Sequence, residues 1–278
     1  MKASAPLRSE IFAANRAVGR VAFGVTAQRG VSRRSRVHEA GSLRVRFPNA
    51  DRRGALDAVI VNTAGGMAGG DRFDIEVAVE PGAGLTVTTA AAEKVYRSLC
   101  PDTEVAVRLD VGNGGTLAWL PQETILFDRA RFRRTIDIKL ARNANLVFAE
   151  AVVFGRSAMG ETVTRGQVFD RWRVRVEGIL KFAETIRLDG EVGQTLARGA
   201  VARGGAAVAS VLKVPGNDDD VTAVRVMQDH FAGEVGVSTW NGLVAARLVA
   251  IDGAALRHDL IAVLGALRGG SMPRLWTN

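Results

Sequence analysis

The sequence predicts a mainly β protein with a small α-helical part near the C-terminus. From about residue 18 to residue 210, apolar and polar residues alternate with the two-residue period of a strand that has one buried face. Gly, Asn, Asp or Pro interrupts this alternation every ten residues or so, as turns between short strands require. After residue 220 the apolar period lengthens to that of a helix. No Pro- or Ser-rich linker divides the chain, so we expect a single domain over residues 1–278.

The clearest strands can be placed by their alternation. Three are expected around residues 75–79, 105–111 and 136–140. A fourth, residues 171–176, should place three arginines on one face of the strand and Trp172, Val174 and Val176 on the other. The polar or Gly-containing breaks between the apolar runs lie at residues 81–84, 113–115, 142–145 and 188–190.

Helical signals are confined to three segments. Residues 89–99 contain good helix formers but span only about three turns, and the alternative is a strand end followed by a loop. Residues 221–233 carry apolar side chains near helical spacing, after possible N-caps at Asp218 to Asp220. A further helix is expected over residues 253–267, where an apolar stripe follows one helix face and consists of Leu256, Leu260, Val263, Leu264 and Leu267.

The composition excludes several protein classes. With 47% hydrophobic and 24% charged residues, the chain is typical of a globular protein rather than a disordered or fibrous one. No run of about 18 apolar residues is present, and Arg8, Glu10 and Arg16 stand where a signal peptide needs an apolar region. Cys100 is the only cysteine, which rules out an internal disulfide and fits a reducing compartment. We therefore expect a cytoplasmic protein without a membrane span.

The formal charge of +8 lies wholly in the first part of the chain. Residues 1–57 hold 12 Lys and Arg against 4 Asp and Glu, whereas the remaining residues hold 25 of each sign. Such a region can serve nucleic acid or an acidic protein partner. Arginines cluster at residues 33–36 and again at residues 129–134, around Phe132. Neither cluster belongs to a recognisable nucleic-acid-binding module, and we interpret both as solvated strand faces or protein contacts.

The glycine-rich segment at residues 62–71 does not match a nucleotide-binding motif. Asp71 stands where a P-loop needs its lysine, and Met67 stands where the dinucleotide fingerprint needs its second glycine. One interpretation is a tight turn between strands, which glycine's backbone freedom permits. The other is a backbone that approaches a partner closely, with Asp71 presented beside it.

Catalytic and metal-binding arrangements are weak. Ser157 lacks the G-x-S-x-G spacing of a nucleophile elbow. Cys100 has His38 or His230 as a possible base, but we favour a small buried cysteine. Cysteine and histidine total four residues, and no two of them sit at ligand spacing for a soft metal. The residues alone thus favour an interaction or scaffold protein over an enzyme.

Five segments, in order along the chain, resemble the urease accessory protein UreD (UreH) family. They are VNTAGGMAGGD at residues 61–71, TTAAAEKVYRS at 88–98, WLPQETILF at 119–127, GRSAMGE at 155–161 and MPRLW at 272–276. The chain departs from the family pattern at Gln122 and Glu123, where the family commonly has Pro or Asp-Pro. The likeness spans nearly the whole chain, and five blocks in register make it specific.

The resemblance implies a fold and a role. The implied fold is a two-layered, helix-like winding of β-sheets with a few helices. The implied role is a non-enzymatic maturation factor that joins UreF and UreG on apo-urease and helps to deliver nickel, with no stably bound cofactor. Two alternatives remain. The first is a basic nucleic-acid-binding protein, and the second, less favoured, is a hydrolase that uses Ser157 or Cys100.

The resemblance also implies a water-filled passage for nickel through the protein. Carboxylates suit such a passage because Ni²⁺ can exchange among single oxygen ligands. Our candidates are Asp71, Glu150 and Glu161, with Thr88 and Thr89 as neutral oxygens that also serve partner binding. Glu150 is chosen because it interrupts the apolar run of residues 146–154. We expect a helical partner such as UreF to cover the apolar stripe at Leu256, Leu260, Val263 and Leu267.

Overall fold

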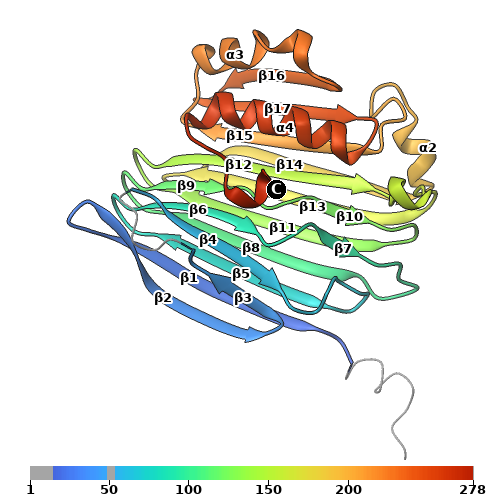
Figure 1. Cartoon of the computed structure of the whole chain (residues 1–278), viewed down its shortest axis with the longest axis horizontal. Coiled ribbons are helices and arrows are strands. Elements are labelled where there is room, and N and C mark those ends of the chain that lie inside the picture. Colours follow the sequence, from blue (N-terminus) through green and yellow to red (C-terminus); the bar gives the residue numbers. More distant parts are fainter. Residues whose placement is uncertain (1–14, 49–53, 278) are drawn as a thin grey trace, which may run out of the picture.

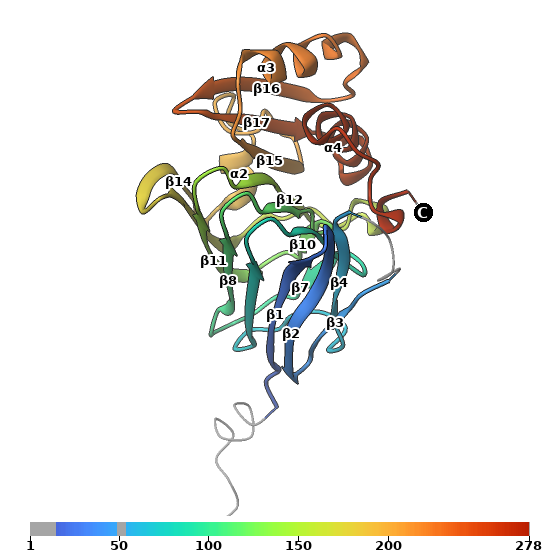
Figure 2. The ribbon, with the colours of Figure 1, turned by 90° about the vertical axis from the view of Figure 1, so that its left-hand side faces the viewer.

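Two β-sheets packed face to face form the body of the protein (Figure 1). The computed structural model describes residues 15–48 and 54–277. Turned by 90°, the two sheets appear as two walls, with the helical part gathered at one end (Figure 2). In the described part of the chain, no helix is both long and apolar enough to cross a membrane.

The strand order within each sheet follows the chain closely. The seven-stranded sheet has the order β14 (Ile179–Gly190), β13 (Gly166–Val176), β11 (Arg131–Leu140), β8 (Thr103–Val111), β5 (Arg72–Val79), β1 (Val18–Gln28) and β2 (Val31–Gly41). The main path of the ten-stranded sheet is β16 (Glu234–Trp240), β17 (Leu243–Ala250), β15 (Ala207–Val214), β12 (Asn145–Phe154), β9 (Thr116–Trp119), β6 (Gly84–Thr89), β4 (Leu56–Asn62) and β3 (Leu43–Arg46). Two short strands complete it, since β10 (Thr124–Leu126) pairs with both β12 and β7 (Glu93–Val95).

From β4 to β13 the chain crosses from one sheet to the other as it advances. Strands β4, β6, β9 and β12 pair in parallel in one sheet, and β5, β8, β11 and β13 pair in parallel in the other. Each crossing adds a coil that stacks on the coil before it. The structure therefore confirms the mainly β class and the helix-like winding of two sheets.

Strand alternation creates the core between the sheets. Ile75, Val107, Ile136 and Trp172 lie in register on four adjacent strands, and all four side chains are buried. The expected two faces of β13 are present, because Trp172 and Val174 point inward while the neighbouring arginines are half-buried or more exposed. Most of the apolar area that stabilises the fold is removed from water along rows of this kind.

Helices cover part of the outer face of the ten-stranded sheet. The longest is α4 (Gly253–Arg268), whose N-cap Asp252 accepts a hydrogen bond from the Ala255 amide at 2.9 Å. It packs beside α3 (Asp218–Arg225) in a second apolar core. The shorter elements are α2 (Val192–Leu196) and the 3₁₀ turns η1 (Ser157–Met159), η2 (Gln228–His230) and η3 (Arg274–Trp276).

The structure corrects two sequence expectations in the C-terminal third and decides between the two interpretations of residues 89–99. Residues 234–250, assigned to no strand from sequence, form the hairpin of β16 and β17. The N-cap of α3 is Asn217, and the predicted caps Asp218 to Asp220 form its first turn. Residues 89–99 follow the alternative, with the end of β6, a loop and the short strand β7.

Candidate functional site between the two sheets

An ion cluster lies buried between the two sheets. Arg134 of β11 points inward together with Phe132 and Ile136, because alternate residues of a strand share a face. Its guanidinium donates to Asp170 of β13 at 3.1 Å from Nε and 2.5 Å from Nη2, and its Nη1 donates to Glu150 of β12 in the facing sheet. The three side chains are at most 5% exposed, so one cation links both sheets inside the core.

Two tryptophans complete the hydrogen bonding of the carboxylates. The Trp119 indole Nε1 donates to Glu150 at 2.9 Å, and the Trp172 indole Nε1 donates to Asp170 at 2.8 Å. Each carboxylate is thus held by one indole and by the shared Arg134 guanidinium. Such bonds are required because buried ions lose their hydration.

Burial shifts the pKa values of this cluster. Loss of water raises the pKa of Glu150 above its ordinary value, although Arg134 and the Trp119 indole act in the opposite direction. Burial alone would lower the pKa of Arg134, but Asp170 and Glu150 raise it well above its ordinary value. Arg134 therefore stays charged, while Glu150 takes up a proton more readily than an exposed glutamate.

A cavity of about 60 Å³ opens beside the cluster. This volume is enough for a few water molecules where polar groups can bind them. Its polar wall contains Asn62, Thr89, Glu93, Gln122, Thr124, Arg134 and Glu150. The remaining wall is apolar and includes Ile60, Phe73, Ile75, Val107 and Phe132. The core therefore holds a small polar chamber with acidic side chains from β7 and β12.

Glu93 is the second acidic group of the chamber. It lies at the start of β7, and Asn62 at the end of β4 donates to it at 3.0 Å. Burial raises the pKa of Glu93, and the bond from Asn62 partly offsets this. Sequence reasoning missed Glu93, although it stands inside one of the five blocks that resemble the UreD family.

The glycine-rich segment is a tight turn between β4 and β5 that packs against its own chain. Gly66 has a φ of 142°, and a Cβ there would lie 2.7 Å from the Tyr96 ring. Asp71 is buried in this turn, where its carboxylate accepts from the Ala17 amide at 2.8 Å and the Ala68 amide at 2.7 Å. Asp71 therefore holds the loop together, and it does not line the cavity.

Glu161 lies in a third environment, on the loop between β12 and β13. Arg156 donates to it at 2.8 Å from Nε, in a partly exposed pair. This bond lowers the pKa of Glu161 from its ordinary value. The three candidate carboxylates thus belong to separate networks, and no cluster of three or more His, Cys, Asp or Glu side chains suited to a metal occurs within residues 15–48 and 54–277.

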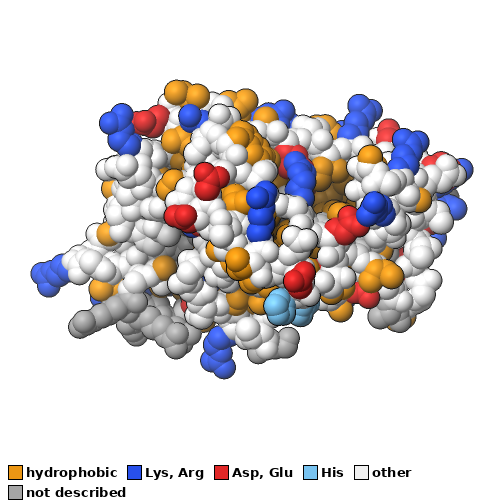
Figure 3. Space-filling view, turned by 90° about the horizontal axis from the view of Figure 1, so that it is seen from above, with side chains coloured by type: hydrophobic (Ala, Val, Ile, Leu, Met, Phe, Trp, Pro, Cys, Tyr) orange, Lys and Arg blue, Asp and Glu red, His pale blue; other side chains and the backbone are white. Residues whose placement is uncertain are grey.

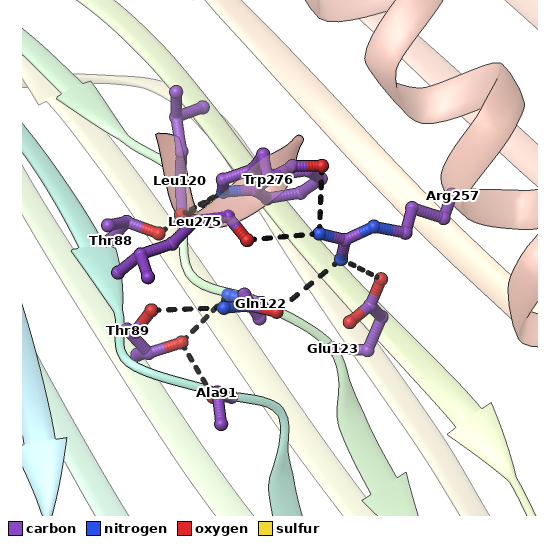
Figure 4. Close-up of polar contacts among 9 residues, drawn as sticks. All are labelled: Thr88, Thr89, Ala91, Leu120, Gln122, Glu123, Arg257, Leu275 and Trp276. Carbon is purple, nitrogen blue, oxygen red and sulfur yellow. Dashed lines mark hydrogen bonds and ion pairs between the residues drawn. The ribbon is translucent and has the colours of Figure 1, made fainter. Parts of the chain in front are cut away.

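Thr88 anchors the C-terminal turn to the sheet, and Thr89 bonds to the Gln122 segment beside it (Figure 4). The Trp276 indole Nε1 donates to the Thr88 hydroxyl and to the Leu120 carbonyl, both at 3.1 Å. The Thr89 hydroxyl accepts from the Gln122 amide at 2.9 Å. Thr88 is buried at 3% exposure, so its hydroxyl serves an internal contact.

Arg257 of α4 forms hydrogen bonds with the same region (Figure 4). Its guanidinium donates to Glu123 at 2.9 Å and to the Trp276 carbonyl at 3.0 Å. The guanidinium also stands 5.0 Å from the centre of the Trp276 ring. Arg257 therefore links α4 both to Glu123, just before β10, and to the C-terminal turn.

The apolar stripe of α4 is covered by the chain itself. Leu256, Leu260, Val263 and Leu267 are 0–2% exposed and pack in the second core against β15 and β17. The expectation that a partner must cover this stripe is corrected, because the unpredicted hairpin of β16 and β17 extends the sheet beneath the helix. A partner can reach the stripe only if α4 leaves the sheet.

Two further residues depart from the sequence interpretation, and a third was missed. Arg134 was grouped with solvated arginines, although it shares the strand face of Phe132 and Ile136, a signal that alternation offered. Cys100 was expected to be buried, but it is exposed in the loop between β7 and β8. Asp170 was missed in the same way as Arg134, since it alternates with Trp172 on the inward face.

Comparisons with known proteins agree with one another. The chain matches the family model described as UreD urease accessory protein over residues 17–277. It is 55% identical over 273 residues to the urease accessory protein UreD of Rhodopseudomonas palustris strain BisB5, which covers 98% of this chain and 96% of that protein. The urease accessory protein UreD of Bradyrhizobium diazoefficiens is 54% identical over 278 residues, the full length of both chains.

Proposed function

The chain belongs to the UreD family of urease accessory proteins, and on that premise we propose that it is a non-enzymatic factor in nickel delivery to urease. Family membership gives a role in urease maturation. In the finer proposal the protein binds apo-urease together with UreF and UreG, and nickel passes through it as cargo.

The polar chamber between the sheets carries this proposal. An apolar core of this size normally excludes charged groups, yet Glu93, Glu150 and Arg134 surround one cavity. Separate carboxylates suit a borderline cation in transit, because a closed set of strong donors would retain it. The chamber offers such separate oxygens and thus supports a route through the interior.

Transit past Glu150 would require an exchange of cations. Arg134 already binds the Glu150 carboxylate, so a nickel ion has to displace the guanidinium from that oxygen. Arg134 keeps its two bonds to Asp170 during such an exchange, which holds it nearby. The raised pKa of Glu150 indicates that its charge is only partly compensated, and this favours an incoming cation.

Among the predicted carboxylates, the geometry supports Glu150 for the route. Asp71 uses both oxygens on backbone amides of its own loop, and Glu161 is paired with Arg156. We therefore assign Asp71 and Glu161 to loop structure in this proposal. Thr89 lines the chamber and remains a candidate neutral oxygen, whereas Thr88 bonds Trp276.

The test is urease activation at controlled nickel concentration. Glu150→Gln keeps the size and the hydrogen bond from Trp119 but removes the negative charge. We expect slower activation at scarce nickel, partial recovery at high nickel, and unchanged co-purification with urease, UreF and UreG. Glu161→Gln is the matched control and should activate as the wild type does. Wild-type activation by Glu150→Gln at every nickel concentration would remove Glu150 from the route.

The proposal includes no catalytic step in this chain. The glycine-rich turn has Asp71 where a nucleotide-binding lysine would stand, and Ser157 lies on a 3₁₀ turn rather than on a strand-to-helix elbow. Purified protein should hydrolyse neither GTP nor a simple ester. Turnover that persists after rigorous removal of partner proteins would contradict this part of the proposal.

A further inference from the structure

A basic groove lies at the end of the sandwich where the two sheets have their N-terminal edge strands. β2 is the last strand of the seven-stranded sheet, and β3 is the last strand of the ten-stranded sheet. The groove between them has a volume of about 530 Å³. Its wall consists of Arg33, Arg34, Val37, Glu39, Val45, Arg46, Phe47 and Leu56.

The sheet register explains why this groove is open. On β2, Arg34 pairs with Val25 and Val37 pairs with Phe23, two core residues of β1 that are at most 1% exposed. Val37 nevertheless remains 43% exposed, although β3 and β4 of the facing sheet contact β2. The groove is thus a partly uncovered continuation of the inner face, with an apolar floor.

The arginines of the groove differ in their partners. Arg46 donates to Glu39 at 3.0 Å, and the Val45 amide also donates to that carboxylate. Arg33 and Arg34 are exposed, and neither side chain has a hydrogen-bond or ion-pair partner among the residues that the structure describes. Two uncompensated guanidinium groups therefore border an apolar floor, an arrangement that can bind carboxylates.

The groove continues round β3 into a second hollow of about 590 Å³. Arg46 and Phe47 line both hollows, so the two adjoin. The second hollow lies over the outer face of β4 beside the C-terminal turn, where Val59, Val61 and Leu275 contribute apolar surface. A segment that follows both hollows meets positive charge first and apolar side chains next.

We infer that this groove binds an acidic, extended segment of a partner protein, with carboxylates on Arg33 and Arg34 and an apolar residue against Val37 and Phe47. Phe47 is held in place by an edge-to-face contact with Phe23 at 5.9 Å, so the floor is fixed before binding. The inference is independent of the nickel route, since no groove residue lines the chamber wall that contains Glu150.

Nucleic acid is the less suitable occupant. Phosphate backbones need several cations along a continuous path, whereas the Glu39 carboxylate lies in this wall and is paired with Arg46. The opposite end of the molecule offers no basic path either, because Lys and Arg alternate there with Asp and Glu around apolar side chains (Figure 3). The unpaired positive charge thus fits carboxylates beside an apolar residue.

The test measures binding of defined peptides by fluorescence anisotropy. The probe is a labelled, capped peptide of about twelve residues in which Asp and Glu alternate with Leu and Val, and its control replaces the acids by Asn and Gln. The variant Arg33→Ser with Arg34→Ser should weaken binding of the acidic probe about tenfold and reduce its salt dependence. The control variant Arg29→Ser with Arg36→Ser removes the same charge from neighbouring exposed positions outside the groove and should change binding less than twofold.

Each result decides the inference. Equal losses in the two double variants would show a general charge effect and overturn it, as would equal binding of the neutral peptide. Tighter binding of a single-stranded oligonucleotide that depends on Arg33 and Arg34 would assign the groove to nucleic acid instead. Absence of peptide binding at low salt would also overturn it. All four arginines are exposed, and unchanged thermal unfolding of each variant would confirm that the fold is intact.

Discussion

Two arginine–glutamate pairs in this protein have the same chemistry and opposite environments. Arg134 and Glu150 meet between the sheets with side-chain exposures of 5% and 4%, whereas Arg156 and Glu161 meet on a loop at 41% and 21%. The pKa of Glu150 is raised by burial, and the pKa of Glu161 is lowered by its bond to Arg156. The difference shows that location in the fold, rather than the identity of the partner, decides how firmly each carboxylate keeps its charge.

The functional meaning of the two pairs follows from that difference. A loop pair in water loses little when it opens, because water replaces the partner. A buried pair has no such replacement, so its charges are held only by the protein groups around them. In the proposed function the interior pair lies on the route of the cation, whereas the loop pair fastens the turn after β12.

Removal of the buried cation should have the largest effect. Arg134→Met leaves Glu150 and Asp170 facing each other without a cation, and we expect a loss of about 3–5 kcal/mol in the free energy of unfolding. Arg156→Met is the control and should change stability far less. Urea unfolding followed by circular dichroism measures both variants. Equal stability of Arg134→Met and the wild type would show that the cluster does not hold the sheets together.

Loss of an indole hydrogen bond should have the second-largest effect on stability. Trp119→Phe removes the hydrogen bond to Glu150, a bond to a charged group that contributes about 1.5–3 kcal/mol. The pKa of Glu150 should rise further, since that bond lowers it. The same urea titration measures the loss, and Tyr96→Phe offers a comparison in which an exposed hydroxyl bond to the Gly65 carbonyl is lost. An identical loss of unfolding free energy in both variants would show that burial does not make the bond from Trp119 more important for stability.

The pH dependence of stability should differ in sign between the two glutamates. The folded pKa of Glu150 lies above the ordinary 4.5, so its stabilising contribution is full below that pH and is lost as the pH rises through the folded pKa. The folded pKa of Glu161 lies below 4.5, so its contribution is full above that pH and is lost as the pH falls through the folded pKa.

The variants Glu150→Gln and Glu161→Gln make this difference in pH dependence measurable. The stability of the wild type relative to Glu150→Gln should increase as the pH falls from 7 towards 4.5. The stability of the wild type relative to Glu161→Gln should decrease as the pH falls below 4.5. Urea titrations at a series of pH values provide both curves, and parallel curves would show that the two environments are equivalent.

The smallest effect is expected for Glu161→Gln at neutral pH. Its pair with Arg156 is solvated, so the variant should unfold at a urea concentration close to that of the wild type. The loop itself should become more accessible, which limited proteolysis between residues 155 and 165 can detect. A large loss of unfolding free energy would show that this pair stabilises the fold as much as the buried cluster does.

The sequence predicted the fold better than the site. Alternation is a local signal, so it located β5, β8, β11 and β13 and the inward face of Trp172 and Val174. Glu150 could be selected because a charge inside an apolar run is unusual. Arg134 and Asp170 were missed, since both lie in strands rich in charged residues, and only their two-residue spacing from Phe132, Ile136 and Trp172 indicates that they face inward.

The remaining wrong predictions concern which side chains are buried by other elements of the fold. The apolar stripe of α4 was identified, but its partner surface on β17 comes from a hairpin in which β16 is half-exposed throughout and carries a weak pattern. Cys100 was expected in the interior on composition alone, whereas its exposure is set by the loop that joins two strands. Sequence periodicity describes a single element, and it does not indicate which other element will cover it.

The bond from Trp276 to Thr88 and Leu120 has a consequence for synthesis of the protein. These contacts join residues that are 188 and 156 positions apart. The parallel coils from β4 to β13 can stack in order as the nascent chain leaves the ribosome, because each strand pairs with one made shortly before. The outer surface above Thr88, however, remains uncovered until residues 274–276 have been translated. During that interval the Thr88 hydroxyl and the Leu120 carbonyl lack the partner that the Trp276 indole later provides.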